Sequence, residues 1–289
     1  MNRLTGLVLL LLFVWGGSYI TAETIKSTLS TYYLPTNYTN VSNKADQSVM
    51  GLYAYVGQGL NHSYEIGYDR FNDDSGTSIQ TSLTGIYTRY FPNQRYRVGG
   101  SLIDTTADTF EGFTLIAGYD YDHYSYSSKE WTVGGNVYFT SHDIGGKTET
   151  IIQLSPSYTT YFYPTIIPGY MSAKTQLTVI NASKRLGAGQ DKTLSISEQL
   201  NYYLNQQWTI TLDCWAGEEI YAFHNGGFVN YNLDETHLYG IGLYATYQFN
   251  APLRVQSGVH YQVFNQANTS NRSSLTKFLL MLSYSFSSK

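Results

Sequence analysis

The sequence predicts an all-β protein, specifically a transmembrane antiparallel up-and-down β-barrel of about fourteen strands. Three observations support this prediction. Apolar and polar residues alternate over many short segments, as in a β-strand whose two faces meet different surroundings. Only 13% of the 289 residues are charged and 29 are tyrosine, a mixture that suits a sheet with one face in lipid and the other in water. Short and long connections also alternate along the chain.

Residues 1–22 have the pattern of a secretory signal peptide. Arg3 supplies a basic start, an apolar stretch covers 7–15, and a small-residue cleavage site ends at Ala22. Beyond this segment no apolar run approaches the roughly 20 residues that a membrane-spanning helix needs. We therefore expect an exported protein whose mature part, residues 23–289, forms the barrel.

Each strand is predicted from alternation between turn-rich boundaries. In 131–140, for example, Val133 and Val137 alternate with Thr132 and Asn136. Each segment is close to the 9–11 residues, roughly, with which a tilted strand crosses a bilayer. In order along the chain, the predicted strands are 24–34, 48–57, 62–71, 78–91, 95–105, 112–123, 131–142, 150–163, 169–181, 192–205, 208–219, 237–250, 253–265 and 276–287. Merging two weak neighbours would leave twelve strands.

The connections between these strands fall into two classes that alternate almost throughout the chain. The tight ones are 57–61, 92–95, 125–130, 163–169, 205–207 and 250–253. The longer and more polar ones are 35–47, 72–78, 105–112, 143–150, 182–192, 217–236 and 265–274. An up-and-down barrel would place every short turn at one end and every long loop at the other, as membrane barrels do. A soluble sandwich has no reason to sort its loops in this way.

The alternation alone leaves open which face is inside. In a soluble sandwich the apolar face packs into a core, whereas in a membrane barrel it contacts lipid. The polar face here carries ionisable and amide groups deep within the strands, such as Lys174 and Gln176 in 169–181. The sequence therefore predicts a hydrated lumen lined by the polar face. Aromatic residues at the lipid-facing strand ends predict an interfacial girdle, formed by Phe91, Trp131, Phe162, Tyr202, Trp208, Phe249, Tyr284 and Phe286.

The last strand supports a family resemblance. Residues 278–286 alternate apolar and small side chains and end in Phe286. This segment resembles the terminal strand of bacterial outer-membrane β-barrels, which the barrel-assembly machinery recognises by alternating apolar residues that end in an aromatic. The sequence departs from the commonest pattern because residues 287–289 follow the aromatic. The resemblance covers the architecture of the whole mature chain, is compatible with porins or polysaccharide-export barrels, and implies a location in the bacterial outer membrane.

Ionisable residues on the predicted polar face are candidates for setting solute selectivity. They are Lys26, Glu65, Asp69, Arg97, Asp120, Asp122, Lys174, Asp213, Arg254, His260 and Lys277. In a closed barrel, strands 253–265, 276–287 and 24–34 are neighbours and would form a basic wall. The wall formed by 62–71 through 112–123 would be mostly acidic, and such a transverse field sorts solutes in channels. A salt-bridge lattice that fills a narrow lumen would use the same residues.

Aromatic side chains are also predicted to face inward, namely Tyr53, Tyr55, Tyr138, Tyr161, Tyr203, Trp215 and Tyr244. Aromatic faces beside hydroxyl and amide groups suit sugar rings, although tyrosine can equally serve as bulk filler. For the longest connection, 217–236, the sequence favours a plain surface loop over a segment folded into the mouth as a constriction. Glu198 falls on the predicted lipid-facing side, which indicates a β-bulge or a different register there.

Enzymatic chemistry finds little support in the residue pattern. Ser141, His142 and Asp143 supply the residue types of a hydrolase, but adjacent strand residues point to opposite faces. Asp120 and Asp122 share a face yet lie near the short-turn end, away from outer-leaflet substrates. There is no Cys/His metal spacing, P-loop or dinucleotide fingerprint, so no cofactor is expected. The formal net charge of −4 argues against binding of nucleic acid.

The predicted function is passive diffusion of small polar solutes or saccharides through a hydrated, charged, tyrosine-lined lumen in the outer membrane. A closed barrel with a structural or surface-interaction role is one alternative, and an outer-leaflet lipid hydrolase is another. The expected partners are outer-membrane lipid, the barrel-assembly machinery and the solute.

Overall fold

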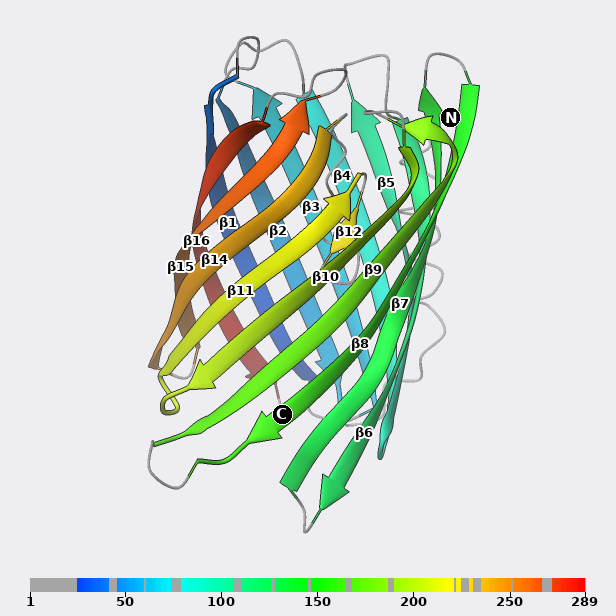
Figure 1. Ribbon diagram of the computed structural model, residues 1–289. Helices are drawn as coiled ribbons and strands as arrows, with labels where there is room; N and C mark the ends of the chain where they lie inside the picture. Colours follow the sequence, from blue (N-terminus) through cyan, green and yellow to red (C-terminus); the bar gives the residue numbers. More distant parts are fainter. Residues whose placement is uncertain are drawn as a thin grey trace.

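The computed structural model describes residues 25–41, 46–59, 61–73, 79–105, 111–125, 128–144, 147–164, 168–186, 190–220, 222–224, 229–230, 235–250, 252–266 and 272–288. Within these ranges, fourteen strands close one antiparallel barrel, and a two-stranded sheet that is not part of the barrel wall lies inside it (Figure 1). No helix in the described part of the chain is long and apolar enough to cross a membrane. The predicted signal peptide lies outside the described residues.

The barrel strands match the predicted ones in number and order. They are β1 (Ile25–Thr39), β2 (Gln47–Gln58), β3 (His62–Asp73), β4 (Ile79–Phe91), β5 (Gln94–Thr105), β6 (Glu111–Ser125), β7 (Ser128–Ile144), β8 (Lys147–Phe162), β9 (Tyr170–Leu186), β10 (Gln190–Tyr203), β11 (Trp208–Glu219), β14 (Glu235–Asn250), β15 (Leu253–Gln266) and β16 (Arg272–Ser288). The prediction of fourteen strands is confirmed, and the alternative of twelve is wrong.

Several strands continue beyond their predicted ends on the long-loop side. β1 remains paired with β16 as far as Thr39 and Ser274, and β9 pairs with β10 as far as Leu186. These extensions carry no clear alternation of apolar and polar residues. Thr36 and Ala182 within these extensions are buried on the inner face. The extensions thus keep an inward face and a continuous backbone ladder, but their residue types do not alternate and so lack the signal on which the sequence prediction depends.

Each barrel strand pairs with its neighbour in the chain, and β1 pairs with β16 to complete the ring. The tight turns therefore gather at one end, which is the lower end in Figure 1. Closure leaves no barrel strand with an unpaired edge, and this is the condition under which a sheet can span a bilayer.

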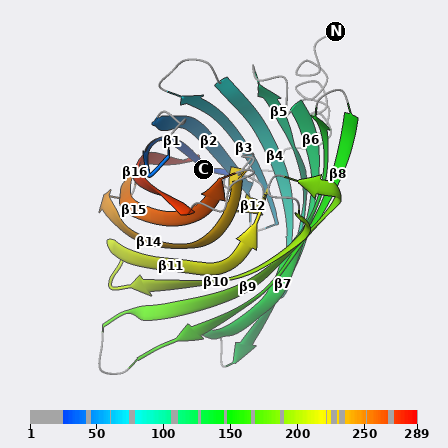
Figure 2. The ribbon, with the colours of Figure 1, turned by 45° about the horizontal axis from the view of Figure 1, so that its top comes forward.

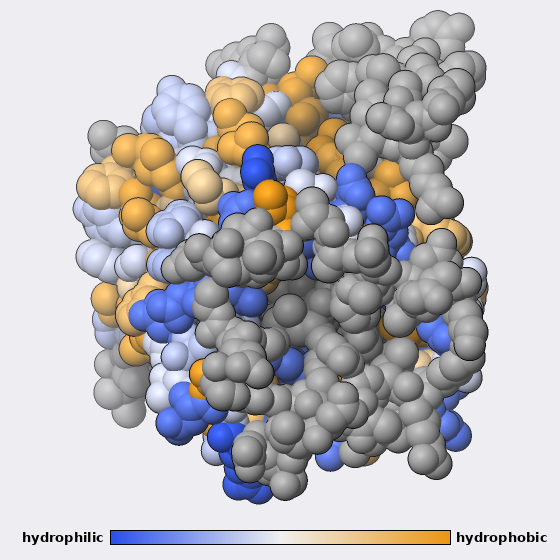
Figure 3. Space-filling view, turned by 90° about the horizontal axis from the view of Figure 1, so that it is seen from above, coloured by the Kyte–Doolittle hydropathy of each residue, from blue (hydrophilic) through white to orange (hydrophobic). Residues whose placement is uncertain are grey.

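The apolar face of the barrel points outward. Val133, Leu177 and Leu243 are exposed by 45%, 39% and 53%, respectively, whereas inward-facing Thr84 and Ser101 are buried and share a hydrogen bond. Seen from above, hydrophobic residues occupy the left and upper edge of the molecule (Figure 3). Since a soluble fold would bury such side chains, the exterior is suited to acyl chains and the barrel is of the transmembrane type.

An aromatic belt follows the outer surface near the tight turns. Trp208 packs on Tyr247 with ring centroids 4.7 Å apart, and Tyr247 packs edge-on against Phe249 at 4.7 Å. On the other side of the barrel, Phe91 contacts Tyr96 at 5.7 Å. Amphipathic rings favour the level of lipid headgroups, so this belt marks one membrane boundary.

Glu198 lies on this outer face. β10 keeps a regular register with both neighbours around it, so neither a bulge nor a shifted register turns the side chain inward. The Thr175 hydroxyl donates a hydrogen bond of 2.6 Å to Glu198 Oε1, and exposed Ile196 and Leu212 lie on the same surface. The Glu198 carboxyl group therefore lies among apolar side chains on the outer surface, and the Thr175 hydroxyl is its hydrogen-bond partner within the protein.

Replacing Glu198 with leucine is expected to stabilise the barrel. An ionisable group on the lipid-facing side of a barrel is unfavourable, and its removal should raise the free energy of unfolding by about 1 kcal/mol. Urea unfolding of the protein in lipid vesicles would measure the change, with Thr175→Val as the control for loss of the hydrogen bond alone. A lower free energy of unfolding for Glu198→Leu would contradict this assignment.

Candidate functional site

The interior of the barrel contains a cavity of about 840 Å³. Seven of the ionisable residues predicted to face the lumen line it, namely Glu65, Asp69, Arg97, Lys174, Asp213, His260 and Lys277. Asp120 and Asp122 are buried on the same inward face next to it. Lys26 and Arg254 are exposed near the tight turns and are not among the lining residues.

Some of the aromatic residues predicted to face inward line the cavity, and others lie nearer the tight turns. Tyr53, Tyr138, Trp215 and Tyr244 line the cavity. Tyr55 lies two residues after Tyr53 in β2 and therefore on the same face of the strand. Nearer the tight turns, Lys129 Nζ lies 5.1 Å from the centre of the Tyr161 ring, and Tyr203 stacks on Tyr170 at 4.2 Å. Sequence reasoning missed Tyr32, which also lines the cavity and donates a hydrogen bond to Asp69.

The connection between β11 and β14 enters the barrel. Its described part includes β12 (Phe223–His224) and β13 (Val229–Asn230), which pair with each other inside the ring of barrel strands (Figure 2). Ile220, Ala222 and Phe223 are each at most 2% exposed. The prediction of a plain surface loop is therefore wrong for these residues, and the alternative of an inward fold is the one that the structure adopts.

An apolar patch on the inner wall explains this inward fold. Ile86, Ile103 and Ile116 face the lumen from three adjacent strands and cluster with Tyr138 and Phe223. The Phe223 ring stacks on the Tyr138 ring with centroids 5.6 Å apart. A second apolar contact, formed by Ile151, Ile180, Ala182, Ile220 and Ala222, continues the packing. Three isoleucines on adjacent predicted polar faces were the sequence signal that could have identified this patch.

Polar contacts hold the same segment against the wall. Gln153 Oε1 accepts a hydrogen bond of 2.8 Å from the Phe223 backbone N–H, and Gln153 Nε2 donates one of 2.7 Å to the Phe223 carbonyl. Glu219 accepts a hydrogen bond from Ser195 and lies 2.8 Å from His224 Nε2. The side chain of Gln153 thus satisfies both backbone groups of Phe223, as a neighbouring strand would.

Gly217 accommodates an irregularity in β11 shortly before the connection leaves the wall. Its φ of +121° is unfavourable for residues with a Cβ atom, and a Cβ there would meet the backbone of Leu194 and Ser195. The pairing of β11 with β14 also shifts register between Ala216 and Glu219. β11 therefore has an irregularity that requires glycine two residues before its end at Glu219, after which the inward connection begins.

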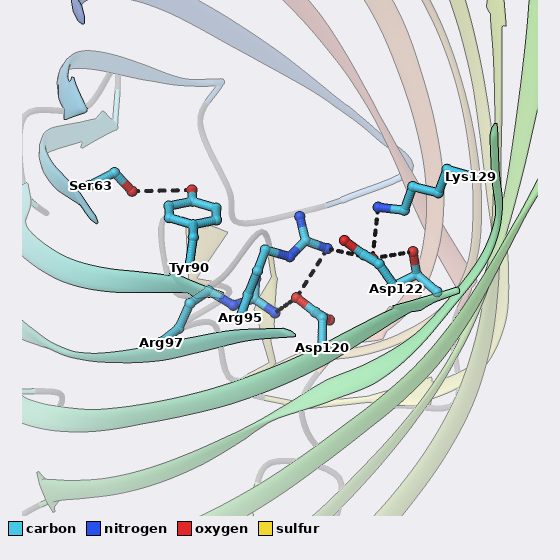
Figure 4. Close-up of polar contacts among 8 residues, drawn as sticks. Ser63, Tyr90, Arg95, Arg97, Asp120, Asp122 and Lys129 are labelled. Carbon is cyan, nitrogen blue, oxygen red and sulfur yellow. Dashed lines mark hydrogen bonds and ion pairs between the residues drawn. The ribbon is translucent and has the colours of Figure 1, made fainter. Parts of the chain in front are cut away.

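A cluster of five charged residues lies on the inner surface of β5, β6 and β7 (Figure 4). Asp120 Oδ2 lies 2.8 Å from Arg97 Nη2 and 3.3 Å from Arg95 Nη2. Asp122 Oδ1 lies 2.7 Å from Lys129 Nζ and 3.7 Å from Arg95. Among the described residues of this cluster, three cations face two carboxylates.

These contacts change the predicted charge pattern of the lumen. The wall that was expected to be mostly acidic includes Arg95 and Lys129, which sequence reasoning missed because both lie at strand ends beside tight turns. Of the cations expected to form a basic wall, Lys277 and His260 line the cavity whereas Lys26 and Arg254 do not. Lys277 also lies within electrostatic range of Asp213 on β11 and Glu235 on β14. The salt-bridge alternative therefore describes the β5–β7 cluster better than a uniform transverse field.

Ser195, Glu219 and His224 lie close together but are not arranged as the catalytic triad of a hydrolase. Glu219 lies between the Ser195 hydroxyl and the His224 imidazole, whereas activation of a serine requires the imidazole to contact the hydroxyl. Within the described ranges, no group of three or more His, Cys, Asp or Glu side chains could hold a metal ion.

The closed barrel, apolar outside and polar inside, defines a transmembrane β-barrel protein. No family model and no curated protein matches the sequence. The structure is similar to a bacterial polysaccharide outer membrane secretin, at 12% identity and a TM-score of 0.52, covering 92% of this chain and 100% of that one. It is also similar to the deltaS2S3 mutant of TodX, a monoaromatic hydrocarbon channel, at 9% identity and a TM-score of 0.51, covering 91% of this chain and 90% of that one. The chain thus has the fold of bacterial outer-membrane barrels.

Proposed function

We propose that this protein is an outer-membrane channel through which small polar solutes or saccharides diffuse passively. The observation that supports the proposal is the cavity of about 840 Å³ inside the barrel, lined by charged, amide and tyrosine side chains. A barrel with a purely structural role would gain stability by filling this space with packed side chains. The segment around Phe223 narrows the path, so solutes would be sorted by size as well as by charge.

The proposal extends to how the protein reaches its membrane. Residues 1–22 would act as a cleaved signal peptide, and the mature barrel would place its tight turns in the periplasm and its long loops outside the cell. The alternating outward-facing residues of β16, ending at Phe286, would be the signal for the barrel-assembly machinery. Acyl chains of the outer membrane would cover the apolar exterior.

Reconstitution in a planar lipid bilayer tests the channel directly. Purified protein should produce discrete conductance steps in potassium chloride, because each inserted barrel adds one water-filled path. Insertion is verified separately from the heat-modifiable gel mobility of the folded barrel in vesicles. A flat current trace from inserted, folded protein would contradict the channel and favour a closed barrel with a surface role.

A further inference from the structure

The two sides of the cavity differ in chemistry. One side, formed by β16, β1, β2 and β3, carries a set of apolar side chains called here the apolar side, namely Leu34, Val49, Phe71, Leu279 and Met281. Leu34, Val49 and Phe71 are cross-strand neighbours. The same strands also contribute Glu65, Asp69 and Lys277 at other levels of the wall. The apolar side chains face inward, on the strand faces that a water-filled pore would line with polar groups. Apolar surface exposed to water in a cavity is unfavourable unless a ligand covers it.

The other side of the cavity is polar and cationic. In the ring of fourteen strands, β9 lies seven strands from β2 in either direction, so its inward-facing residues stand across the lumen from the apolar side. This polar side contributes Asn136, Lys174, Gln176, Gln199 and Asn201. Amide groups supply hydrogen-bond donors here, and Lys174 supplies a positive charge.

Lys174 differs from the other cations near the cavity. Arg97 is paired with Asp120 at 2.8 Å, and Lys277 lies within electrostatic range of Asp213 and Glu235. Lys174 makes no hydrogen bond or ion pair with any described residue, and Arg97, Asp120 and Arg95 act on it only through longer-range electrostatics. A cation without a directly bonded carboxylate among the described residues has capacity for a charge-assisted hydrogen bond to an anionic ligand.

We infer that the lumen binds amphipathic organic anions, small molecules with one anionic head and a hydrocarbon body. The head would be held by Lys174 and the neighbouring amides, and the body would cover the apolar side. The inference deepens the proposed function, on which it rests, by naming a solute class. A cavity of about 840 Å³ falls within the range of roughly 300–1,000 Å³ typical of small-ligand sites.

Calorimetric titration of the protein in lipid nanodiscs tests this inference, with empty nanodiscs subtracted. The probes are octanoate, acetate, octanamide and maltose. Octanoate should bind more than tenfold more tightly than acetate, because each buried methylene tightens binding by about threefold to fourfold. It should also bind about tenfold more tightly than octanamide, which has the same chain without the charge. Equal binding of octanoate and octanamide, or tighter binding of maltose, would overturn the inference.

Three variants locate the two parts of the site. Lys174→Gln should weaken octanoate about tenfold and leave octanamide unchanged, whereas Lys174→Arg should keep octanoate binding. Leu279→Asn should weaken both eight-carbon probes and leave acetate unchanged. The matched control is Lys192→Gln, which removes an exposed cation that is not among the residues lining the cavity. Unchanged octanoate binding by folded Lys174→Gln would remove Lys174 from the site.

The titration of octanoate and the recording of conductance test the two proposals independently. Octanoate binding without conductance steps would contradict the channel but leave the site intact. Conductance steps without preference for octanoate would contradict only the assignment of the solute class. Folding of every variant is checked by heat-modifiable gel mobility before titration.

Discussion

Replacing Gln153 with alanine is expected to raise the single-channel conductance severalfold. The substitution removes both hydrogen bonds that hold the Phe223 backbone against the wall and leaves two buried backbone groups without their partner. This should destabilise the inward position of the segment by about 2 kcal/mol, which corresponds to a roughly 30-fold rise in the released population. A lumen without this segment is wider, so more ions pass per unit time.

Planar-bilayer recording of the Gln153→Ala channel measures the effect, together with the permeability to larger neutral solutes. Phe223→Ala, which removes the ring stacked on Tyr138, should also raise the single-channel conductance. The matched control is Gln176→Ala, because Gln176 lines the same cavity from the adjacent strand β9 and makes its hydrogen bond to Thr178. Equal conductance of the Gln153→Ala and Gln176→Ala channels would mean that the segment does not limit the current.

The double substitution Asp120→Asn and Asp122→Asn is expected to make the channel more selective for anions. Asparagine preserves the shape of each side chain while removing its charge, so Arg95, Arg97 and Lys129 would no longer be neutralised. One charge about 4 Å from a permeating ion is worth about 1 kcal/mol in water. The ratio of chloride to potassium permeability should therefore rise about fivefold or more.

Reversal potentials across a potassium chloride gradient report this ratio. The control is Glu198→Gln, which neutralises a carboxyl group on the outer surface and should leave the reversal potential unchanged. If the double variant had the reversal potential of the original protein, ions would not pass the cluster on β5, β6 and β7. An equal shift in both variants would point to an effect of overall charge instead.

Much of the barrel was predictable from local sequence because its signals are local. The alternation that places Val133 and Val137 outside and Thr132 inside depends only on neighbours two residues apart. The difference between a tight turn such as 205–207 and a long connection such as 217–236 can also be read along the chain. These patterns determined the strand number, the order of the strands and which face meets lipid.

The candidate site was predictable only in part. Asp120, Lys174 and Lys277 were placed inward because each lies within a clearly alternating strand. Arg97 and Asp213 were placed inward in the same way. Arg95, Lys129 and Glu235 were not, because Arg95 and Lys129 lie beside tight turns and Glu235 lies at the start of a strand next to a long connection. At such positions the period of two is interrupted, so the sequence alone does not assign a face.

The sequence by itself determined a closed antiparallel barrel with an apolar exterior, since strand period, turn spacing and residue type are properties of the chain taken in order. Only the tertiary structure decided what fills the lumen. The contact of Phe223 with Tyr138 and Gln153, and the position of Lys174 across from Leu279, join residues far apart in the chain. Such contacts depend on the closure of the ring and on the height of each strand within it, and no local pattern encodes either quantity.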